Sequence, residues 1–441
     1  MYGPLLTDFY QLTMGYAYWK SGLAEKEACF QLFFRKAPFS GQFALACGLQ
    51  DAIDFLRGLR FRDEDIAYLQ KLGFDEKFLA YLSNMRFSCS VDAVAEGTIV
   101  FAKEPILRVT GPILQGQLVE TPLLNMINFQ TLIATKAARV CYAAQGDEVI
   151  EFGLRRAHGP DGGLSASRAA YIGGCDSTSN VLAGQRFGIP LRGTMAHSWI
   201  MSFPDEQHAF DTYASAWPGA CVLMVDTHDS PSGIKNAIKT GNLLRARGQD
   251  LLGVRLDSGD LLQLSKVARE ELDAAGFAHT KIIASGDLDE YSITDLKKHE
   301  APIDTWGVGT RLVTAHDDPA LGGVYKLVAI KDEPNAWRPC AKTSNDSEKS
   351  TLPGLLQTRR FLHDGKFVGD CVYGLSSTHT SLGEETDFVD LLKPILKAGQ
   401  IHADLPTIAQ VKANAQRELA CLDDRFKTIR QASPYPVEVR S

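Results

Sequence analysis

The sequence lacks any long apolar run. No stretch approaches the roughly 20 consecutive apolar residues that a membrane-spanning helix requires. The first 16 residues have no basic segment, and Asp8 interrupts their apolar residues. These absences predict a chain without a membrane span and without a secretory signal, and therefore a cytoplasmic protein.

The chain also lacks an excess of basic charge and any paired cysteine motif. Its 46 lysines and arginines face 53 acidic residues, which gives a formal net charge of −7. This balance argues against a general nucleic-acid binder, because such proteins neutralise phosphates, but a local basic pocket for a small phosphorylated ligand stays open. The nine cysteines are dispersed and form no C-x-x-C pair. Such a set predicts reduced thiols rather than a disulfide framework or a zinc site.

Six short apolar runs alternate with helical stretches in the middle of the chain, and a polar or glycine-rich turn follows each run. The chain has 441 residues, 45% of them apolar, which is enough for one or two domains with a large core. Runs of this kind, buried on both sides, are typical of parallel strands in βα units. The runs are 148–154, 189–195, 220–225, 251–256, 281–284 and 304–308.

The polar residues of these units cluster after the strands rather than before them. The chemistry of TIM barrels lies at the carboxyl ends of the strands, so the pattern predicts a TIM-like α/β barrel. A doubly wound open sheet is the alternative, but it would carry one dominant glycine-rich fingerprint near its first strand, and the sequence has none.

Both flanks of this region differ from it, and together they predict a second α/β domain. We expect residues 1–119 to supply its N-terminal part, residues 120–335 to form the barrel, and residues 336–441 to return to the second domain. Short strands are expected within 86–119, a long helix over 121–146, a hairpin turning at Asp364-Gly365, and helices in the last forty residues.

The strand ends bring arginines, carboxylates, histidines and glycines to one predicted face. Guanidinium groups bind carboxylate or phosphate, glycines let backbone N–H groups approach phosphate, and carboxylates hold magnesium or sugar hydroxyls. We therefore expect a phosphorylated sugar and a second anionic group as ligands. The candidates are Arg155, Arg156, His158, His197, Ser198, Asp226, His228, Asp229, Arg255, Asp257, Ser258, Asp260, Ser285, Gly286, Asp287, Asp289, Gly307, Gly309, Thr310 and Arg311.

Each of these residues also has a simpler interpretation. A lone histidine such as His197 is more often a hydrogen-bonded core residue, and an aspartate after a strand often only caps the next helix. Polar residues at six successive strand ends on one face favour a functional site over these simpler interpretations. A barrel hydrolase with two carboxylates about 5–9 Å apart, drawn from Asp226, Asp257 and Asp287, stays open as an alternative.

Six motifs together resemble the nicotinate phosphoribosyltransferase family. They are LLTDFYQLTM, EFGLRRAHGPDGG, GGCDSTSNVLAG, GTMAHS, GVRLDSGDL and GVGTRL, in the family's order from Leu5 to Leu312. Residues 342–360 also resemble the family's lysine-rich stretch that ends in Pro-Gly. The resemblance implies the type II phosphoribosyltransferase fold, an irregular α/β barrel with a second α/β domain.

The resemblance also implies a reaction. A phosphoribosyl group passes from phosphoribosyl pyrophosphate to nicotinate, giving nicotinate mononucleotide and pyrophosphate on the salvage route to NAD. ATP is implied as a co-substrate, hydrolysed through a phosphorylated histidine, and Mg²⁺ as the cofactor. A nicotinamide phosphoribosyltransferase on the same fold is the nearest alternative.

Roles follow from the resemblance position by position. It implies His197 as the phosphorylated residue, with Arg255 and Asp257 as the other catalytic groups. Ser198 is counted with the substrate-binding residues, as a neighbour that caps the following helix or orients the imidazole. The resemblance implies a substrate-contacting arm within residues 1–119, on which Tyr10 is expected to stack on nicotinate from the neighbouring subunit, in a homodimer with shared active sites. The other implied contacts are Phe152 and Arg155 with the pyridine, Asp176 with the substrate, Asp257 and Asp287 with ribose and Mg²⁺, and Gly286, Gly309 and Thr310 with the 5′-phosphate.

Overall fold

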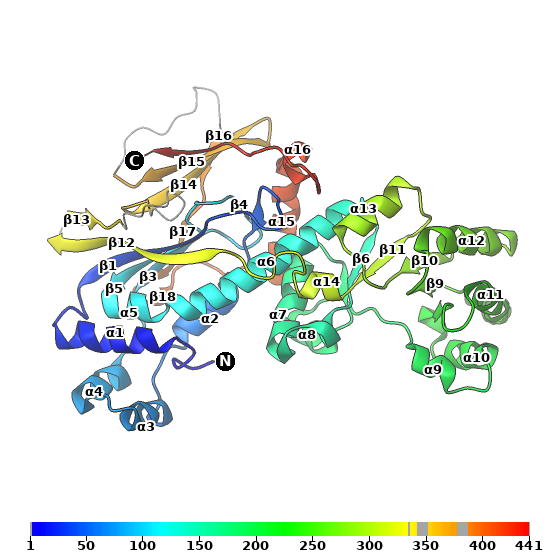
Figure 1. The fold of residues 1–441 in the computed structure, drawn as a ribbon, viewed down its shortest axis with the longest axis horizontal. Coiled ribbons are helices and arrows are strands. Elements are labelled where there is room, and N and C mark those ends of the chain that lie inside the picture. Colours follow the sequence, from blue (N-terminus) through cyan, green and yellow to red (C-terminus); the bar gives the residue numbers. More distant parts are fainter. Residues whose placement is uncertain (1, 334–335, 342–351, 377–386, 441) are drawn as a thin grey trace. The chain divides into compact units, whose positions relative to one another are not determined.

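The computed structural model describes residues 2–333, 336–341, 352–376 and 387–440 (Figure 1). The chain divides into two compact units. The central unit is formed by residues 136–319, and the flanking unit by residues 1–135 and 320–441. Residues 342–351, the first part of the lysine-rich stretch, lie outside the described residues.

The central unit contains a six-stranded sheet in which all paired strands are parallel. The strand order is β7-β6-β11-β10-β9-β8, so the last strand of the unit lies beside the first. The strands are β6 (Glu148–Glu151), β7 (Ser177–Thr178), β8 (Val222–Met224), β9 (Gly253–Leu256), β10 (Lys281–Ala284) and β11 (Thr305–Val308).

This order runs round a ring, as in a barrel, rather than reversing as in a doubly wound sheet. The mixed α/β fold with a parallel sheet is therefore confirmed. Within residues 136–319 no hydrogen-bonded ladder joins β7 to β8, so closure of the barrel stays a prediction.

The predicted strand at 189–195 is wrong. Its place beside β6 is taken by β7, a strand of only two residues that the apolar pattern did not reveal. From the predicted run, Leu191 alone joins the sheet, through a parallel bridge to Thr178. Pro190 has no N–H to donate to a ladder, which explains why the run does not extend into a strand.

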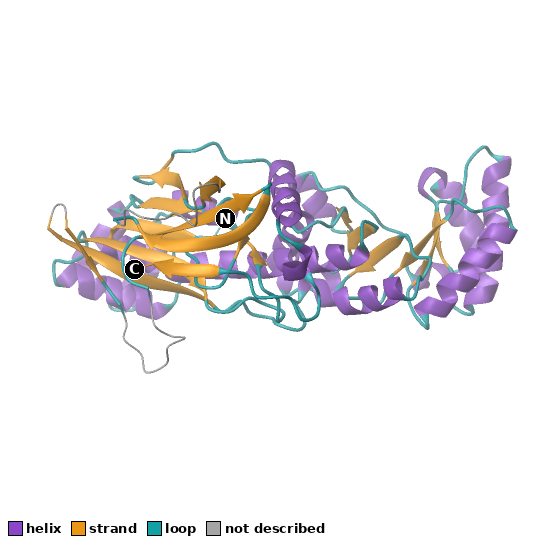
Figure 2. Ribbon diagram, turned by 90° about the horizontal axis from the view of Figure 1, so that it is seen from above, coloured by secondary structure: helices purple, strands orange, loops and turns teal. Residues whose placement is uncertain are grey.

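Helices alternate with these strands, and Figure 2 shows them around the strands of the central unit. Several begin at a side-chain cap: Asp205, Asp229, Asp260 and Asp289 each accept a hydrogen bond from a backbone N–H of the helix that follows. The helices are α7 (Gly159–Ile172), α8 (Val181–Phe187), α9 (His197–Met201), α10 (Glu206–Ala216), α11 (Ser230–Ala246), α12 (Leu261–Ala274), α13 (Glu290–Lys298) and α14 (Thr310–Val313), with 3₁₀ turns at Leu154–Arg156 and Pro218–Ala220.

The flanking unit is built on a mixed set of sheets, ordered β13-β12-β1-β5-β3-β17-β18, β16-β14-β15-β19 and β2-β4. Its strands are β1 (Glu27–Phe34), β2 (Ala44–Leu45), β3 (Ser90–Ala93), β4 (Ile99–Val100), β5 (Leu107–Pro112), β12 (Gly323–Glu333), β13 (Ala336–Pro339), β14 (Leu356–His363), β15 (Lys366–Gly374), β16 (Asp387–Asp390), β17 (Lys393–Lys397), β18 (Gln400–Ile401) and β19 (Val437–Arg440).

The helices that begin in the flanking unit are α1 (Phe9–Lys20), α2 (Leu49–Arg57), α3 (Asp63–Lys71), α4 (Glu76–Asn84), α5 (Ile113–Leu118), α6 (Glu120–Ala144), α15 (Ile408–Cys421) and α16 (Asp424–Lys427). The predicted long helix is confirmed as α6, which carries the chain into the central unit. In the part of the chain that the structure describes, no helix combines the length and apolarity needed to cross a membrane.

Predictions for the flanks are partly confirmed. The hairpin forms between β14 and β15, with Asp364 and Gly365 both at positive φ, as a tight turn requires. The helical prediction for the last forty residues is wrong at residues 437–440, which form β19 and pair in parallel with β15. Valines alternate with charged residues there, which is a strand period rather than a helical one.

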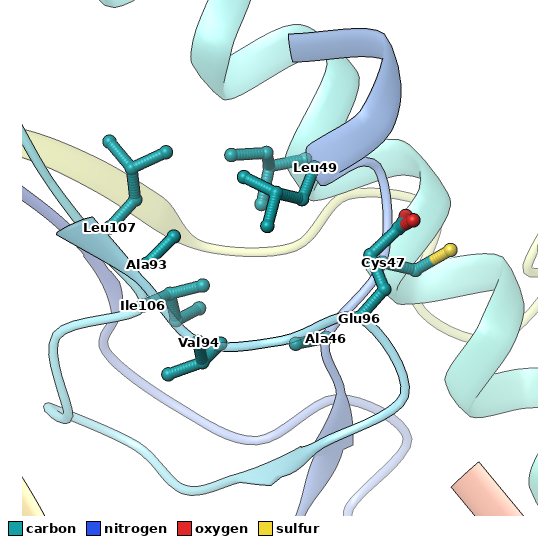
Figure 3. A pocket seen from close by; sticks show the side chains of 9 residues that line it. Ala46, Cys47, Leu49, Ala93, Val94, Glu96, Ile106 and Leu107 are labelled. Carbon is teal, nitrogen blue, oxygen red and sulfur yellow. The ribbon is translucent and has the colours of Figure 1, made fainter. Parts of the chain in front are cut away.

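A small apolar cavity lies inside the flanking unit, between residues of β3 and the segments around β2, β5 and α6 (Figure 3). Its volume is about 10 Å³, the lower limit for one water molecule. Glu96 contributes a carboxylate to its wall, and that carboxylate accepts a hydrogen bond from the Gly48 N–H at 2.6 Å. The cavity is therefore a packing defect of the core rather than a ligand site.

Candidate active site

Arg255 lies at the centre of a hydrogen-bonded group at the carboxyl end of β9. Its Nη2 donates to Asp257 Oδ1 at 2.6 Å, its Nε to Ser285 Oγ at 2.8 Å, and its Nη1 to Thr194 Oγ1 at 2.9 Å. The guanidinium carbon is 5.4 Å from the centroid of the Phe152 ring. Since the side chain is only 14% exposed, these bonds hold one planar cation in a fixed orientation beside an aromatic ring.

Asp257 is the acidic partner of this arginine. Its Oδ1 also accepts a hydrogen bond from the Ser285 hydroxyl. Burial raises the pKa of the Asp257 carboxyl, but the Ser285 hydrogen bond and the charges of Arg255 and His197 outweigh burial and bring the pKa below its ordinary value. The carboxylate is therefore ionised at neutral pH.

His197 faces the other oxygen of the same carboxylate. Its Nε2 lies 3.9 Å from Asp257 Oδ2, and its Nδ1 lies 3.2 Å from Thr227 Oγ1. The imidazole side chain is 41% exposed. One ring nitrogen is thus oriented by a hydroxyl, the other lies beside a carboxylate, and the side chain as a whole is partly exposed to solvent. An imidazole in this setting can act as a nucleophile or exchange a proton.

Ser198 has a smaller part in this geometry than expected. Helix α9 begins at His197 and its N-cap residue is Ala196, so the prediction that Ser198 caps this helix is wrong. Ser198 is exposed at the second position of the helix. The imidazole is instead hydrogen-bonded through Nδ1 to Thr227, which follows β8.

Asp226, at the end of β8, organises the turn that carries Asp257. Its Oδ2 accepts from the Asp257 N–H at 2.9 Å and from Ser258 Oγ at 2.7 Å. Its Oδ1 is buried and has no hydrogen-bond partner within the described residues. This oxygen is an unused acceptor, which a cation or a hydroxyl of a bound molecule would satisfy.

The turns after β10 and β11 are tied together by Arg311. Its Nη1 donates to Asp289 Oδ2 at 2.8 Å, and its Nη2 donates to Asp287 Oδ2 at 3.2 Å. Gly286 has a φ of +96°, and a Cβ there would clash with the Asp257 carbonyl oxygen. The β10 turn therefore approaches the β9 turn more closely than any other residue type would allow.

The expected phosphate-binding residues lie at these turns. Gly309 precedes α14 and Thr310 is its first residue. A Cβ on Gly309 would come within 3.2 Å of the Phe152 carbonyl oxygen, so the β11 turn packs against the β6 turn. The structure thus brings Phe152, Gly286, Asp287, Gly309 and Thr310 to the same edge of the sheet as Arg255, Asp257 and His197.

Two expected residues, Arg155 and Asp176, are not among the hydrogen-bonded residues of this group, and Tyr10 belongs to the flanking unit, so its part in the site stays a prediction. Arg155 lies in the exposed 3₁₀ turn after β6. Asp176 lies at the amino end of β7, where its carboxylate accepts from the Val149 N–H at 2.9 Å; Ser179, not Asp176, follows the carboxyl end of that strand. Tyr10 lies on α1 of the flanking unit and is 47% exposed. Burial, then the charges of Glu120 and Asp8, raise the pKa of its phenol.

Several partners at the site were not predicted in the positions they hold. Ser285 was a candidate by its position after a strand, Asp226 was a candidate by its position and as a carboxylate of the hydrolase alternative, and Thr194 and Thr227 were not predicted. Thr194 belongs to the GTMAHS motif and Thr227 directly follows Asp226, so their proximity to the motifs was the available signal. Among the described residues, no group of three or more histidine, cysteine, aspartate and glutamate side chains forms a metal-binding cluster.

Comparison with known proteins supports the family suggested by the motifs. The family model of nicotinate phosphoribosyltransferase matches residues 148–397, its N-terminal domain matches residues 5–128, and its C-terminal domain matches residues 371–441. The chain is 43% identical to a nicotinate phosphoribosyltransferase of Bacillus subtilis, over 99% of this chain and 92% of that protein. It is 36% identical to the human nicotinate phosphoribosyltransferase, over 98% and 94% of the two chains.

Solved structures agree with this result. The crystal structure of human nicotinic acid phosphoribosyltransferase aligns with a TM-score of 0.86 at 33% identity, covering 99% of this chain and 98% of that one. A nicotinate-nucleotide pyrophosphorylase from Pyrococcus furiosus shares the fold, with a TM-score of 0.77 at 24% identity. From the motifs, the site geometry and these matches together, the chain belongs to the nicotinate phosphoribosyltransferase family.

Proposed function

We propose that this protein transfers the phosphoribosyl group of phosphoribosyl pyrophosphate to the ring nitrogen of nicotinate. The products are nicotinate mononucleotide and pyrophosphate, and the reaction belongs to NAD salvage. The observation that carries the proposal is the fixed pair of Arg255 and Phe152, a largely buried cation beside an aromatic ring. Nicotinate is an aromatic anion, so this pair complements both its charge and its shape.

The carboxylates favour the chemical step. As pyrophosphate leaves, positive charge develops at the anomeric carbon of the ribose. Ionised Asp257 supplies negative charge at this end of the sheet, beside the buried, unpartnered Oδ1 of Asp226, and a fixed charge stabilises a transition state without reorganisation. Backbone groups at Gly286, Gly309 and Thr310 would bind the 5′-phosphate, in turns that Arg311 holds together.

Mg²⁺ fits this donor set as an ion that enters the site bound to the pyrophosphate group of phosphoribosyl pyrophosphate. It would not be an ion held by protein ligands alone. Such an ion uses one or two carboxylates and keeps its other positions for phosphate oxygens and water. Asp257 and Asp287 are the proposed ligands, and the unpartnered Asp226 Oδ1 is a third available oxygen. When bound, Mg²⁺ would neutralise the leaving pyrophosphate.

We further propose that ATP phosphorylates His197. Nε2 attacks the γ-phosphorus, an N–P bond forms, and the P–O bond to ADP breaks with ADP as the leaving group; water later hydrolyses the N–P bond to release phosphate. Asp257, 3.9 Å from Nε2, and Thr227 at Nδ1 orient the ring. The added phosphoryl group brings about −1.5 to −2 charges beside Asp257 and Arg255. This charge would reorder the loops to favour substrate binding and product release.

A homodimer with shared sites completes the proposal. Helix α1 is anchored in its own unit, since the Gln11 amide donates to Glu120 Oε2 at 2.9 Å, while Tyr10 stays exposed on the same helix. An exposed aromatic ring on an anchored helix suits a contact with a second copy of the chain. We propose that Tyr10 stacks on nicotinate bound to the partner subunit.

Steady-state rates with nicotinate and nicotinamide test the function. The two pyridines differ at one substituent, carboxylate against amide, so nicotinamide is the matched control. With phosphoribosyl pyrophosphate and Mg²⁺, we expect kcat/KM for nicotinate to exceed that for nicotinamide. A preference for nicotinamide, or tight binding of nicotinate without turnover, would overturn the proposal.

A further inference from the structure

A buried carboxylate lies directly behind the turn that carries Phe152. Glu151, the last residue of β6, is 1% exposed. Its Oε2 accepts from Thr178 Oγ1 at 2.6 Å and from Ser167 Oγ at 2.8 Å, and its Oε1 accepts from the Gly153 N–H. One side chain therefore satisfies donors from β7, from α7 and from the turn after β6.

These donors are themselves connected. The Asn180 N–H donates to Thr178 Oγ1 at 3.0 Å, and the Asn180 amide donates to Ser167 Oγ at 3.1 Å. Asn180 is also the N-cap of α8, where its side chain accepts from the Ala183 N–H. A closed polar network of this kind specifies one arrangement, because each group is satisfied by the others.

The turn is also packed from the opposite side. A Cβ at Gly153 would clash with the side chain of Val313, and the Phe152 N–H donates to the Val308 carbonyl oxygen at 2.8 Å. The Glu151 carboxylate holds the Gly153 N–H from one direction while Val313 closes the other. The direction of the Phe152 ring, 5.4 Å from the Arg255 guanidinium, depends on this arrangement.

We propose that Glu151 is a positioning residue for the pyridine substrate. Its carboxylate fixes the turn at 152–155, so that the Phe152 ring and Arg255 form one preorganised wall. This inference rests on the proposed function, because it treats Phe152 and Arg255 as the nicotinate-binding pair. Glu151 touches no substrate itself and acts through Phe152.

The chemistry of the network explains why a carboxylate is needed. Thr178 Oγ1 already accepts from the Asn180 N–H and gives its single proton to Glu151. An amide in place of this carboxylate would direct an N–H₂ group at Ser167 and Thr178, and the Thr178 proton would lose its acceptor. Losing this acceptor costs free energy and detaches the side chain from β7 and α7, so the turn that it holds through the Gly153 N–H is less firmly fixed.

The test compares Glu151→Gln with wild type by steady-state kinetics and by equilibrium binding of nicotinate. We expect the KM for nicotinate to rise about tenfold. We expect the KM for phosphoribosyl pyrophosphate to stay within about twofold, because the β10 and β11 turns are held by Arg311. A loss of folded enzyme alone would lower the active fraction and leave both KM values unchanged.

Glu290→Gln is the matched control. Glu290 is a fully buried carboxylate of the same unit, paired with Lys136 at 2.7 Å and Arg139 at 2.9 Å. Its substitution should lower the thermal midpoint and leave the KM for nicotinate within about twofold of wild type. An equal rise in this KM for both variants, or no rise for Glu151→Gln, would overturn the inference.

A second pair of variants covers the case in which Glu151→Gln does not fold. Thr178→Val removes one donor to the carboxylate, and Thr178→Ser retains it. We expect Thr178→Val to raise the KM for nicotinate several-fold and Thr178→Ser to restore it. Equal values for the two would contradict the positioning role. If wild type itself does not turn over nicotinate, the proposed function fails, whereas an active wild type with unchanged variants refutes only this inference.

Discussion

His197 Nε2 lies 3.9 Å from Asp257 Oδ2, and the other oxygen of that carboxylate is bonded to Arg255 Nη2 at 2.6 Å. One carboxylate thus connects the imidazole to the cation beside the Phe152 ring. A change of charge on the imidazole or at the guanidinium therefore alters the electrostatic potential at the same Asp257 carboxylate. This connection gives a physical route by which the state of His197 can influence binding of an anionic base.

Replacing Asp257 should strongly reduce catalytic efficiency. We expect Asp257→Asn to lower kcat/KM for nicotinate about 100-fold, because the variant loses the negative charge and an acceptor of Arg255 and Ser285. Asp260→Asn is the matched control in the same turn: Asp260 caps α12 through the Gln263 N–H, and asparagine caps equally well. Similar losses in both variants would show that the turn, not the charge, matters.

The loss of stability at acidic pH should depend in part on Asp257. Because its folded-state pKa lies below the unfolded value, its ionised form contributes stability that is complete above the unfolded pKa, about 3.9. That contribution disappears as pH falls from this value through the lower folded-state pKa. Thermal midpoints between pH 3 and pH 7 should fall more steeply on acidification for wild type than for Asp257→Asn. Parallel curves would contradict the assigned pKa direction.

Labelled ATP tests the phosphohistidine. With γ-labelled ATP, wild type should acquire label that is lost in acid and retained in base, and His197→Ala should acquire none. Thr227→Val removes the hydroxyl at Nδ1 and keeps the imidazole, so it should slow labelling without abolishing it. Acid-labile, base-stable label on His197→Ala would disprove the assignment.

Substitutions at two glycines distinguish the effect of backbone strain from the effect of the close approach between the β10 and β9 turns. Gly286 and Gly188 both have positive φ, 96° and 71°, but a Cβ would clash with the Asp257 carbonyl oxygen only at Gly286; at Gly188 the space is open. Gly188→Ala should therefore cost about 1 kcal/mol of unfolding free energy and leave activity unchanged. Gly286→Ala should also raise the KM for phosphoribosyl pyrophosphate about tenfold or more. Equal kinetic effects would contradict a phosphate-binding role for the β10 turn.

Much of the central sheet was predictable because its strands are apolar runs bounded by turns. β8, β9, β10 and β11 lie within the predicted runs. β7 was not predictable in this way, since two residues carry no period and its backbone is satisfied by neighbours distant in sequence. The run at 189–195 shows the reverse: its composition suits a strand, but Pro190 removes a ladder donor and the chain enters the sheet at a single bridge.

The candidate site was likewise predictable only in part. Residue type and position at strand ends identified Arg255, Asp257 and His197, because these side chains are chemically distinctive. Their hydroxyl partners Thr194 and Thr227 come from other segments, and a threonine after a strand carries no signal of its own. Asp176 had a distinctive residue type, but its place at the amino end of β7 depends on a strand that the pattern did not reveal.

The pairing of Arg255 with the nicotinate carboxylate is the centre of this account, and Arg255→Lys tests it most directly. Lysine keeps the charge but loses the planar fork that bonds Asp257, Ser285 and Thr194 at once. The measurement is kcat/KM for nicotinate and for nicotinamide with wild type and the variant. We predict that the preference for nicotinate falls at least tenfold, through a rise in its KM. An unchanged preference would contradict the account.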